Sequence, residues 1–247
     1  MKNFRRRLVA LLLGLIIVFP AVPVFAQEND LGISDWAIED ISDSQYIGIL
    51  EISEETLSMN YLKDIDEEIL KEFIENFDKK LESTGVKREN NFENVPVEKD
   101  LTRERVLLEI YNVLGKYDSN ITAETNPIEF FSENGILKGK GSDNKLEDIA
   151  TIEEALIFFV RSTKYFYEIN DLGGRGVFYK VENDGNTVYL FGSIHLGDNM
   201  MYPIEANRLK AFEESDKLFV ELDVQDQGIL AQLQKYQTRS DGKKLKD

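Results

Sequence analysis

The sequence has no cysteine, one histidine and one tryptophan among its 247 residues. Without cysteine it can form neither a disulfide framework nor a lipid-anchored cysteine. Basic residues are also outnumbered, because 29 Lys and Arg stand against 46 Asp and Glu. Nucleic acids and anionic lipids both attract proteins through clustered cations, so this balance argues against either partner. We interpret the acidity as a solvated surface that keeps the protein soluble.

Long apolar runs are missing except at the very start of the chain. A basic segment with Lys2 and Arg5 to Arg7 precedes the apolar stretch Leu8 to Phe19, and small residues at Val24 and Ala26 follow. This order is typical of a signal peptide over residues 1–26, cleaved before Gln27. The alternative is an uncleaved anchor, but about a dozen residues fall short of the roughly 20 that span a bilayer. We therefore expect a secreted or cell-surface protein with no stable membrane span after cleavage.

Residues 27–172 have the pattern of a helical region with polar loops. Apolar residues recur at helical spacing over 65–81, after Thr102 and after Thr151. Both threonines suit the N-cap position, and Glu154 gives the second helix start the spacing of a capping box. Two segments resemble copies of one unit, each with a Gly-Ile-Leu turn, a loop and a Thr-capped helix. The turns are Gly48 to Leu50 and Gly135 to Leu137.

These segments resemble the S-layer homology repeat. The sequences Asp35-Trp36-Ala37 and Thr102-Arg103-Glu104 fit the first unit, while Asn134 to Gly139 and Thr151-x-Glu153 fit the second. The resemblance implies non-covalent attachment to cell-wall polysaccharide, with Arg103 and Trp36 near the polymer. The second unit has Ile152 in place of the arginine. The alternative is that Arg103 is a solvated residue at a helix start and that the pair only packs as a helical domain.

After Gly173 and Gly174 the pattern changes from helical to alternating. Strand-like runs over 176–181 and 187–194 flank the turn sequence Asn183 to Asn186, which predicts a hairpin. A helix over 204–214 and a strand over 217–223 are expected next, so that the second hairpin strand, the helix and the last strand form a βαβ unit. The predicted fold class is therefore α+β, with a helical domain followed by the beginning of an α/β domain.

The βαβ arrangement places His195 and Glu221 at the carboxyl ends of parallel strands, where ligand crevices form. An imidazole and a carboxylate can ligate a divalent metal, or act as a base and its orienting partner. Gly192 would allow the backbone to approach a ligand closely. The alternatives are a hydrogen-bonded loop histidine and a solvated strand end at Glu221 and Asp223. With a single histidine in the chain, carboxylates would have to supply the remaining ligands.

This part of the chain resembles the TraB/GumN (pheromone shutdown) family. The resemblance covers about residues 175–224 and is carried by Phe178 to Val181, Asp184 to His195, Met201 to Pro203 and Val220 to Asp223. It implies that Gly192, Ser193 and His195 form the family's first Gly-x-x-His motif loop and that Glu221 is its glutamate. It further implies metal-dependent hydrolysis of a peptide, with His195 and Glu221 as catalytic groups and metal ligands.

The family's second Gly-x-x-His motif does not occur, because the sequence contains no second histidine. We therefore expect residues 173–247 to be only the first portion of that domain, and a fragment of this kind to be inactive alone. Three functions remain open. They are a metal-dependent hydrolase when the domain is complete, a non-enzymatic protein that binds wall polysaccharide, and a protein that sequesters a peptide signal without cleaving it.

Overall fold

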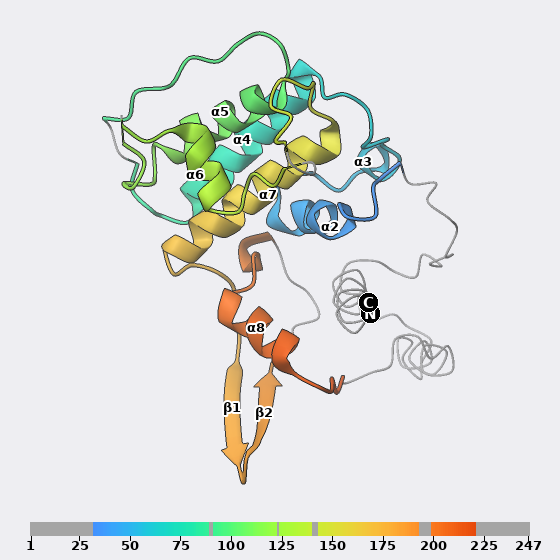
Figure 1. Ribbon diagram of the computed structural model, residues 1–247. Coiled ribbons are helices and arrows are strands. Elements are labelled where there is room, and N and C mark those ends of the chain that lie inside the picture. Colours follow the sequence, from blue (N-terminus) through green and yellow to red (C-terminus); the bar gives the residue numbers. More distant parts are fainter. Residues whose placement is uncertain (1–31, 89–90, 123, 140–142, 193–198, 221–247) are drawn as a thin grey trace, which may run out of the picture.

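The computed structural model describes residues 32–88, 91–122, 124–139, 143–192 and 199–220. Helices form one body, from which a β-hairpin and a short helix project (Figure 1). The helices are α2 (Ile38–Ile47), α3 (Glu54–Leu57), α4 (Glu67–Ser83), α5 (Arg103–Leu114), α6 (Pro127–Glu133), α7 (Ile152–Ile169) and α8 (Ala206–Glu214), with the 3-10 helix η1 (Asn199–Met201). The strands are β1 (Phe178–Asn183) and β2 (Asn186–Phe191). This is the α+β class expected from the sequence.

Helix α7 lies at the centre of the helical body and packs against α2, α4 and α5. Its apolar side chains are almost fully buried, since Leu156, Phe159 and Phe166 have no exposed surface. Phe159 meets two rings of α4 edge to face, with centroids 6.0 Å from Phe73 and 5.5 Å from Phe77. None of the helices in the described part of the chain is long and apolar enough to cross a membrane.

Three helices of this body begin in the same way. Thr102, Thr151 and Asp66 are the N-caps of α5, α7 and α4, and each side chain accepts a hydrogen bond from the backbone N–H three residues later. The predicted caps at Thr102 and Thr151 are therefore confirmed, including the capping box with Glu154. The third start was missed because Asp66 is followed by acidic residues rather than by the Thr-Arg pattern. Each of these three helices packs against the other two. Ion pairs join the first turn of α5 to the first turns of α7 and α4.

The two Gly-Ile-Leu turns also share one geometry. Gly48 and Gly135 have φ of 87° and 69°, a left-handed conformation that glycine adopts at low cost. After Gly48, the N–H groups of Ile49 and Leu50 both donate to the Ser44 carbonyl, at 2.9 and 3.1 Å. After Gly135, the N–H groups of Ile136 and Leu137 donate in the same way to Phe131, both at 2.9 Å.

The hairpin of β1 and β2 is antiparallel, with Phe178 opposite Phe191 and Asn183 opposite Asn186. Asp184 and Gly185 form the turn with φ of 48° and 79°, the two positive values that suit a tight hairpin. The predicted hairpin and the helix over 204–214 are thus confirmed. Residues 217–220 are not part of a strand, and the remainder of the expected 217–223 strand lies outside the described residues, as does the predicted signal peptide.

Candidate functional site

The predicted motif loop is described only at its first residue. Gly192 follows β2, and its N–H donates to the Val177 carbonyl at 2.7 Å, which extends the hairpin pairing by one residue. Ser193, His195 and Glu221 lie outside the described residues, so their roles as catalytic groups and metal ligands stay predictions. Within the described ranges, no group of three or more His, Asp or Glu side chains could hold a metal ion.

The segment that follows the motif loop is anchored on the helical body. The Asn199 carbonyl accepts a hydrogen bond from the Lys80 ammonium of α4. Lys80 is only 5% exposed, and its ammonium lies 5.5 Å from the centre of the Tyr167 ring. The Asn199 side chain lies directly over Gly48, where a Cβ would come within 2.5 Å of its amide nitrogen. A side chain at position 48 would therefore displace the Asn199 side chain, and the positive φ at this position disfavours any residue other than glycine there.

Two further contacts hold the same segment. The rings of Tyr202 and Tyr46 stack with centroids 5.2 Å apart, which joins the segment to α2. Burial of Tyr46 raises the pKa of its hydroxyl to about 12. On the other side, the Gly174 N–H donates to the Pro203 carbonyl at 3.0 Å. The segment 199–203 is thus held between the helical body and the base of the hairpin, an arrangement that no sequence motif predicted.

Arg103, one of the two predicted polymer contacts, is buried in the helical body. Its side chain is 3% exposed and forms an ion pair with Glu154, also 3% exposed, at 2.8 Å. The guanidinium also donates from Nε to the Asn144 carbonyl at 3.1 Å and lies 5.1 Å from the centre of the Phe158 ring. These contacts give Arg103 a structural role in joining α5 to α7, rather than the solvated position considered as the alternative.

Trp36, the other predicted polymer contact, has the opposite environment. Its side chain is 57% exposed and lies in the turn that leads into α2. A large exposed aromatic ring is available to a partner. The Trp36 ring is therefore accessible from the surface, whereas the Arg103 guanidinium is enclosed.

The ion pair of Arg103 belongs to the arrangement of the three helix starts. We call the contact between two of these helix starts a junction. At each junction the first residue of one helix faces the third residue of the other. Arg103 of α5 pairs with Glu154 of α7, and Glu67 of α4 pairs with Arg105 of α5 at 2.6 Å. At the third junction the corresponding residues are Ile152 of α7 and Ile69 of α4, which carry no charge. Two junctions are therefore closed by an arginine, and the third is not.

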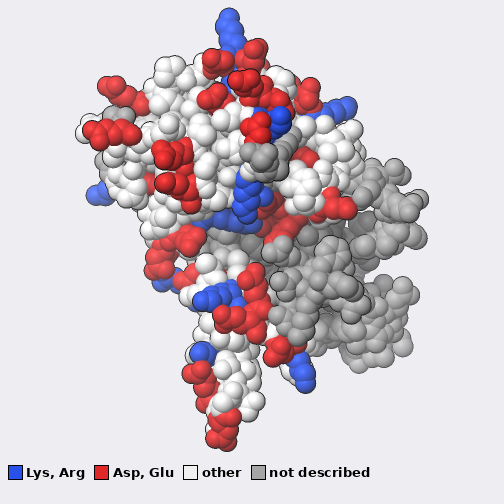
Figure 2. Space-filling model, in the orientation of Figure 1, with Lys and Arg blue, Asp and Glu red and all other residues white. Residues whose placement is uncertain are grey.

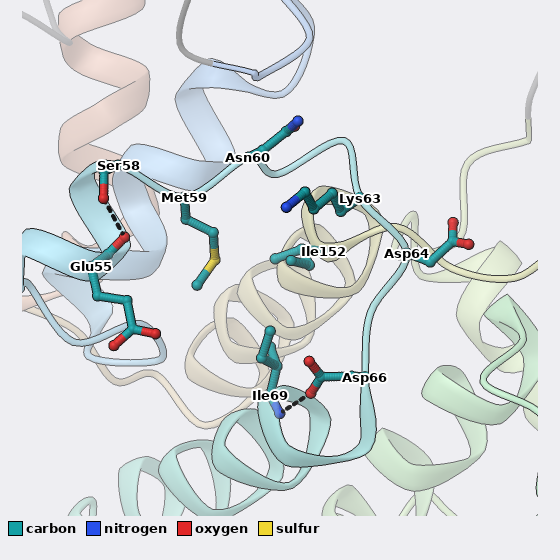
Figure 3. Close-up of a pocket in the computed structure, with 9 residues that line it drawn as sticks. All are labelled: Glu55, Ser58, Met59, Asn60, Lys63, Asp64, Asp66, Ile69 and Ile152. Atoms are coloured by element: carbon teal, nitrogen blue, oxygen red, sulfur yellow. Dashed lines mark hydrogen bonds between the residues drawn. The ribbon is translucent and has the colours of Figure 1, made fainter.

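A surface pocket of 380 Å³ opens at this third junction (Figure 3). Ile152, Ile69 and Met59 give it an apolar wall. The segment 58–66 contributes Lys63, which extends across the pocket, and the Asp66 carboxylate, which caps α4. Glu55 of α3 lies at the far end. The pocket thus combines an apolar wall with charged groups around it.

The electrostatic surroundings are acidic. Asp and Glu side chains spread over the visible face of the helical body (Figure 2). Inside, Asp40 of α2 is paired with Arg161 at 3.0 Å and with Lys164 at 3.2 Å. Lys164 also pairs with Asp43 at 2.5 Å, and burial raises the pKa of the Asp43 carboxyl. These pairs fasten α2, and with it Tyr46, to α7.

Comparison with known proteins finds a likeness in the C-terminal part of the chain. Residues 177–247 match the model of the TraB/PrgY/gumN family. The match confirms the resemblance seen in the sequence and includes Gly192, Ser193, His195 and Glu221. No curated protein matches the chain. No solved structure matches it either.

Proposed function

We propose, from the TraB/PrgY/gumN match over residues 177–247, that this is an exported cell-surface protein whose complete domain is a metal-dependent hydrolase of peptides. The observation that supports this proposal is the position of the match. It contains the Gly192-x-x-His195 motif and Glu221 in the order and spacing that the resemblance requires.

In this proposal His195 contributes an imidazole nitrogen and Glu221 a carboxylate, a donor set that suits a divalent metal. A metal bound there would activate water and polarise the scissile carbonyl. The helical body would help to position the motif loop, because Lys80 contacts Asn199 and Tyr46 contacts Tyr202 in the segment that follows it. Lys80 and Tyr46 are therefore positioning residues in this scheme.

The test begins with the coding DNA beyond the Asp247 codon, because the family's second Gly-x-x-His motif is not among residues 1–247. The longest protein encoded is then purified, and its metal content and its cleavage of a peptide library are measured. We expect His195→Ala and Glu221→Gln to lose both bound metal and cleavage while the far-UV spectrum is unchanged. Glu182→Gln, an exposed change in β1, is the matched control. Unchanged cleavage in His195→Ala would remove this histidine from the mechanism, and binding without cleavage would favour a sequestering protein.

Export has its own test. We propose that residues 1–26 direct the chain out of the cell and are removed before Gln27. The N-terminal sequence of protein recovered from the culture medium or cell surface should therefore begin at Gln27. Recovery of the intact N-terminus from the membrane fraction would instead favour the uncleaved anchor.

Wall-polysaccharide binding is the second candidate, and the exposure of Trp36 favours it. In this account the helical body attaches to the polymer through this ring, and Arg103 supports the fold. Purified cell walls should then retain the wild-type protein, and Trp36→Ala should weaken retention. Leu62→Ala is the matched control, because Leu62 is also exposed and apolar, at 49%. Equal retention of the wild type and Trp36→Ala would exclude this contact.

A further inference from the structure

The pocket between Ile152 and Ile69 is used by neither of these proposed functions. Its position is explained by the two junctions that are closed. At the first, the Arg103 guanidinium joins Glu154 to the Asn144 carbonyl, in the loop before α7. At the second, the Arg105 guanidinium joins Glu67 to the Lys99 carbonyl, in the loop before α5.

Both closed junctions therefore follow one rule. A guanidinium fills the space between two helix starts and is held by a carboxylate and by a backbone carbonyl of a neighbouring loop. Such charge-assisted hydrogen bonds are among the stronger polar contacts in proteins. At the third junction the loop 58–65 and a carboxylate at the start of α4 are in place, but Ile152 and Ile69 are too short and apolar to supply the cation. The pocket therefore lies at the one of the three junctions where no arginine is present.

The pocket has the features needed to take a basic side chain from outside. The aliphatic part of an arginine or lysine packs well against apolar surface while its charged end stays polar. Ile152, Ile69 and Met59 offer that surface, and the carboxylates of Asp66 and Glu55 lie beyond it (Figure 3). None of the residues that line the pocket is aromatic, so it offers no ring face for a sugar.

We propose that this pocket binds an arginine side chain of a peptide, with the stem against Ile152 and Ile69 and the guanidinium between Glu55 and Asp66. The net charge of −17 would raise the local concentration of such a basic peptide. Lys63, which extends across the pocket, must swing toward solvent when the arginine enters. Lys63 is exposed, so this movement is open to it.

Calorimetric titration of the whole chain with N-acetylarginine methylamide tests the proposal. The citrulline analogue has nearly the same shape without the charge, so we expect it to bind at least about tenfold more weakly. Glu55→Gln should weaken arginine binding, and Lys63→Gln should strengthen it by removing the competing cation. Ile152→Arg should abolish binding by filling the pocket from within. Glu54→Gln is the control, because Glu54 precedes Glu55 but does not line the pocket.

Equal binding of the arginine and citrulline probes would overturn the proposal, as would an affinity that Glu55→Gln and Lys63→Gln leave unchanged. Tighter binding of glucosamine than of arginine would assign the pocket to a sugar instead. If Ile152→Arg does not fold, Glu55→Gln and Lys63→Gln still test the proposal. Because binding is measured without any cleavage, the result is independent of whether the intact domain is a hydrolase.

Discussion

The buried pair of Arg103 and Glu154 is the residue-scale feature with the largest expected effect on stability. Removing one partner of a buried ion pair leaves the other charge desolvated, which costs about 3–5 kcal/mol. We expect Arg103→Met to lower the free energy of unfolding by roughly that amount in urea denaturation. Because both side chains are 3% exposed, added salt should change this difference little.

The equivalent pair of Glu67 and Arg105 supplies the control for that experiment. Glu67 is 64% exposed, so its ion pair is screened by water and should contribute at most about 1 kcal/mol. Glu67→Gln should therefore destabilise the protein much less than Arg103→Met. Similar losses in the two variants would mean that burial does not distinguish these junctions.

At the residue scale the sequence predicted which residues cap helices, but it did not predict which side chains are buried or what they contact. The capping threonines Thr102 and Thr151 were identified because an N-cap depends on neighbours within one turn. Arg103 was considered as a polymer contact or a solvated residue, but it is buried, and the carboxylate of Glu154 compensates its charge. Glu154 is distant from Arg103 in the sequence, so no local sequence pattern predicts that the two residues pair. Lys80 was not singled out for the same reason, since its contact with Asn199 joins distant segments.

The element-scale feature of most interest is the anchoring of η1 on α4 through Lys80. A hydrogen bond from a charged donor contributes about 1.5–3 kcal/mol, so its loss should allow the segment 199–202 to open more often. We expect Lys80→Met to raise the amide hydrogen exchange rate of this segment about tenfold or more, while the centre of α7 keeps its protection. Hydrogen exchange followed by mass spectrometry of the peptides measures both.

Lys79→Met is the matched variant, because Lys79 is the exposed neighbour of Lys80 on the same helix. It removes the same charge from the chain without touching Asn199. Exchange over 199–202 that rises equally in both variants would show that net charge, and not the anchoring contact, controls this segment.

At this scale the sequence predicted elements with strong local signals. The hairpin followed from Asn183 to Asn186, whose turn chemistry fixes the pairing of the flanking strands. The helix over 204–214 and the Gly-Ile-Leu turns were likewise recognised from nearby residues. The third helix start at Asp66 was not recognised because it carries an aspartate cap rather than the threonine of the two repeated units, although aspartate is an equally good N-cap residue. The predicted strand over 217–223 is wrong over residues 217–220, and its last three residues lie outside the described part of the chain.

At the scale of the whole molecule, the helical body and the projecting hairpin differ in burial. The hairpin exposes Tyr179, Val181, Val188 and Leu190, which lie opposite one another on one face of the sheet, each at least half exposed. A hairpin with an apolar face needs further strands or a helix against that face for stability. The helical body, in contrast, has a continuous core of its own. The helical body and the hairpin should therefore differ in how their stability changes under conditions that disrupt a buried core.

Alkaline pH is such a condition, because Tyr61, Tyr117 and Tyr167 are among the buried tyrosines of the helical body. Desolvation raises the pKa of Tyr61, Tyr117 and Tyr167 from the usual 10 to about 12, and at Tyr117 the hydrogen bond to Asp78 adds to this rise. The folded state then holds these protons more tightly than the unfolded state. Their contribution to stability is complete below pH 10 and is lost as the pH rises from 10 to 12.

We therefore expect the free energy of unfolding to fall steeply above pH 10, with the helical body losing its structure in one step. Absorbance at 295 nm reports tyrosinate, and circular dichroism at 222 nm reports the helices. The late-titrating tyrosines should ionise together with the loss of helix. Tyr61→Phe and Tyr167→Phe each remove one such hydroxyl group. Either variant should raise the pH at which half of the helical structure is lost. Full ionisation of all ten tyrosines near pH 10 with the helices intact would contradict the burial on which this prediction rests.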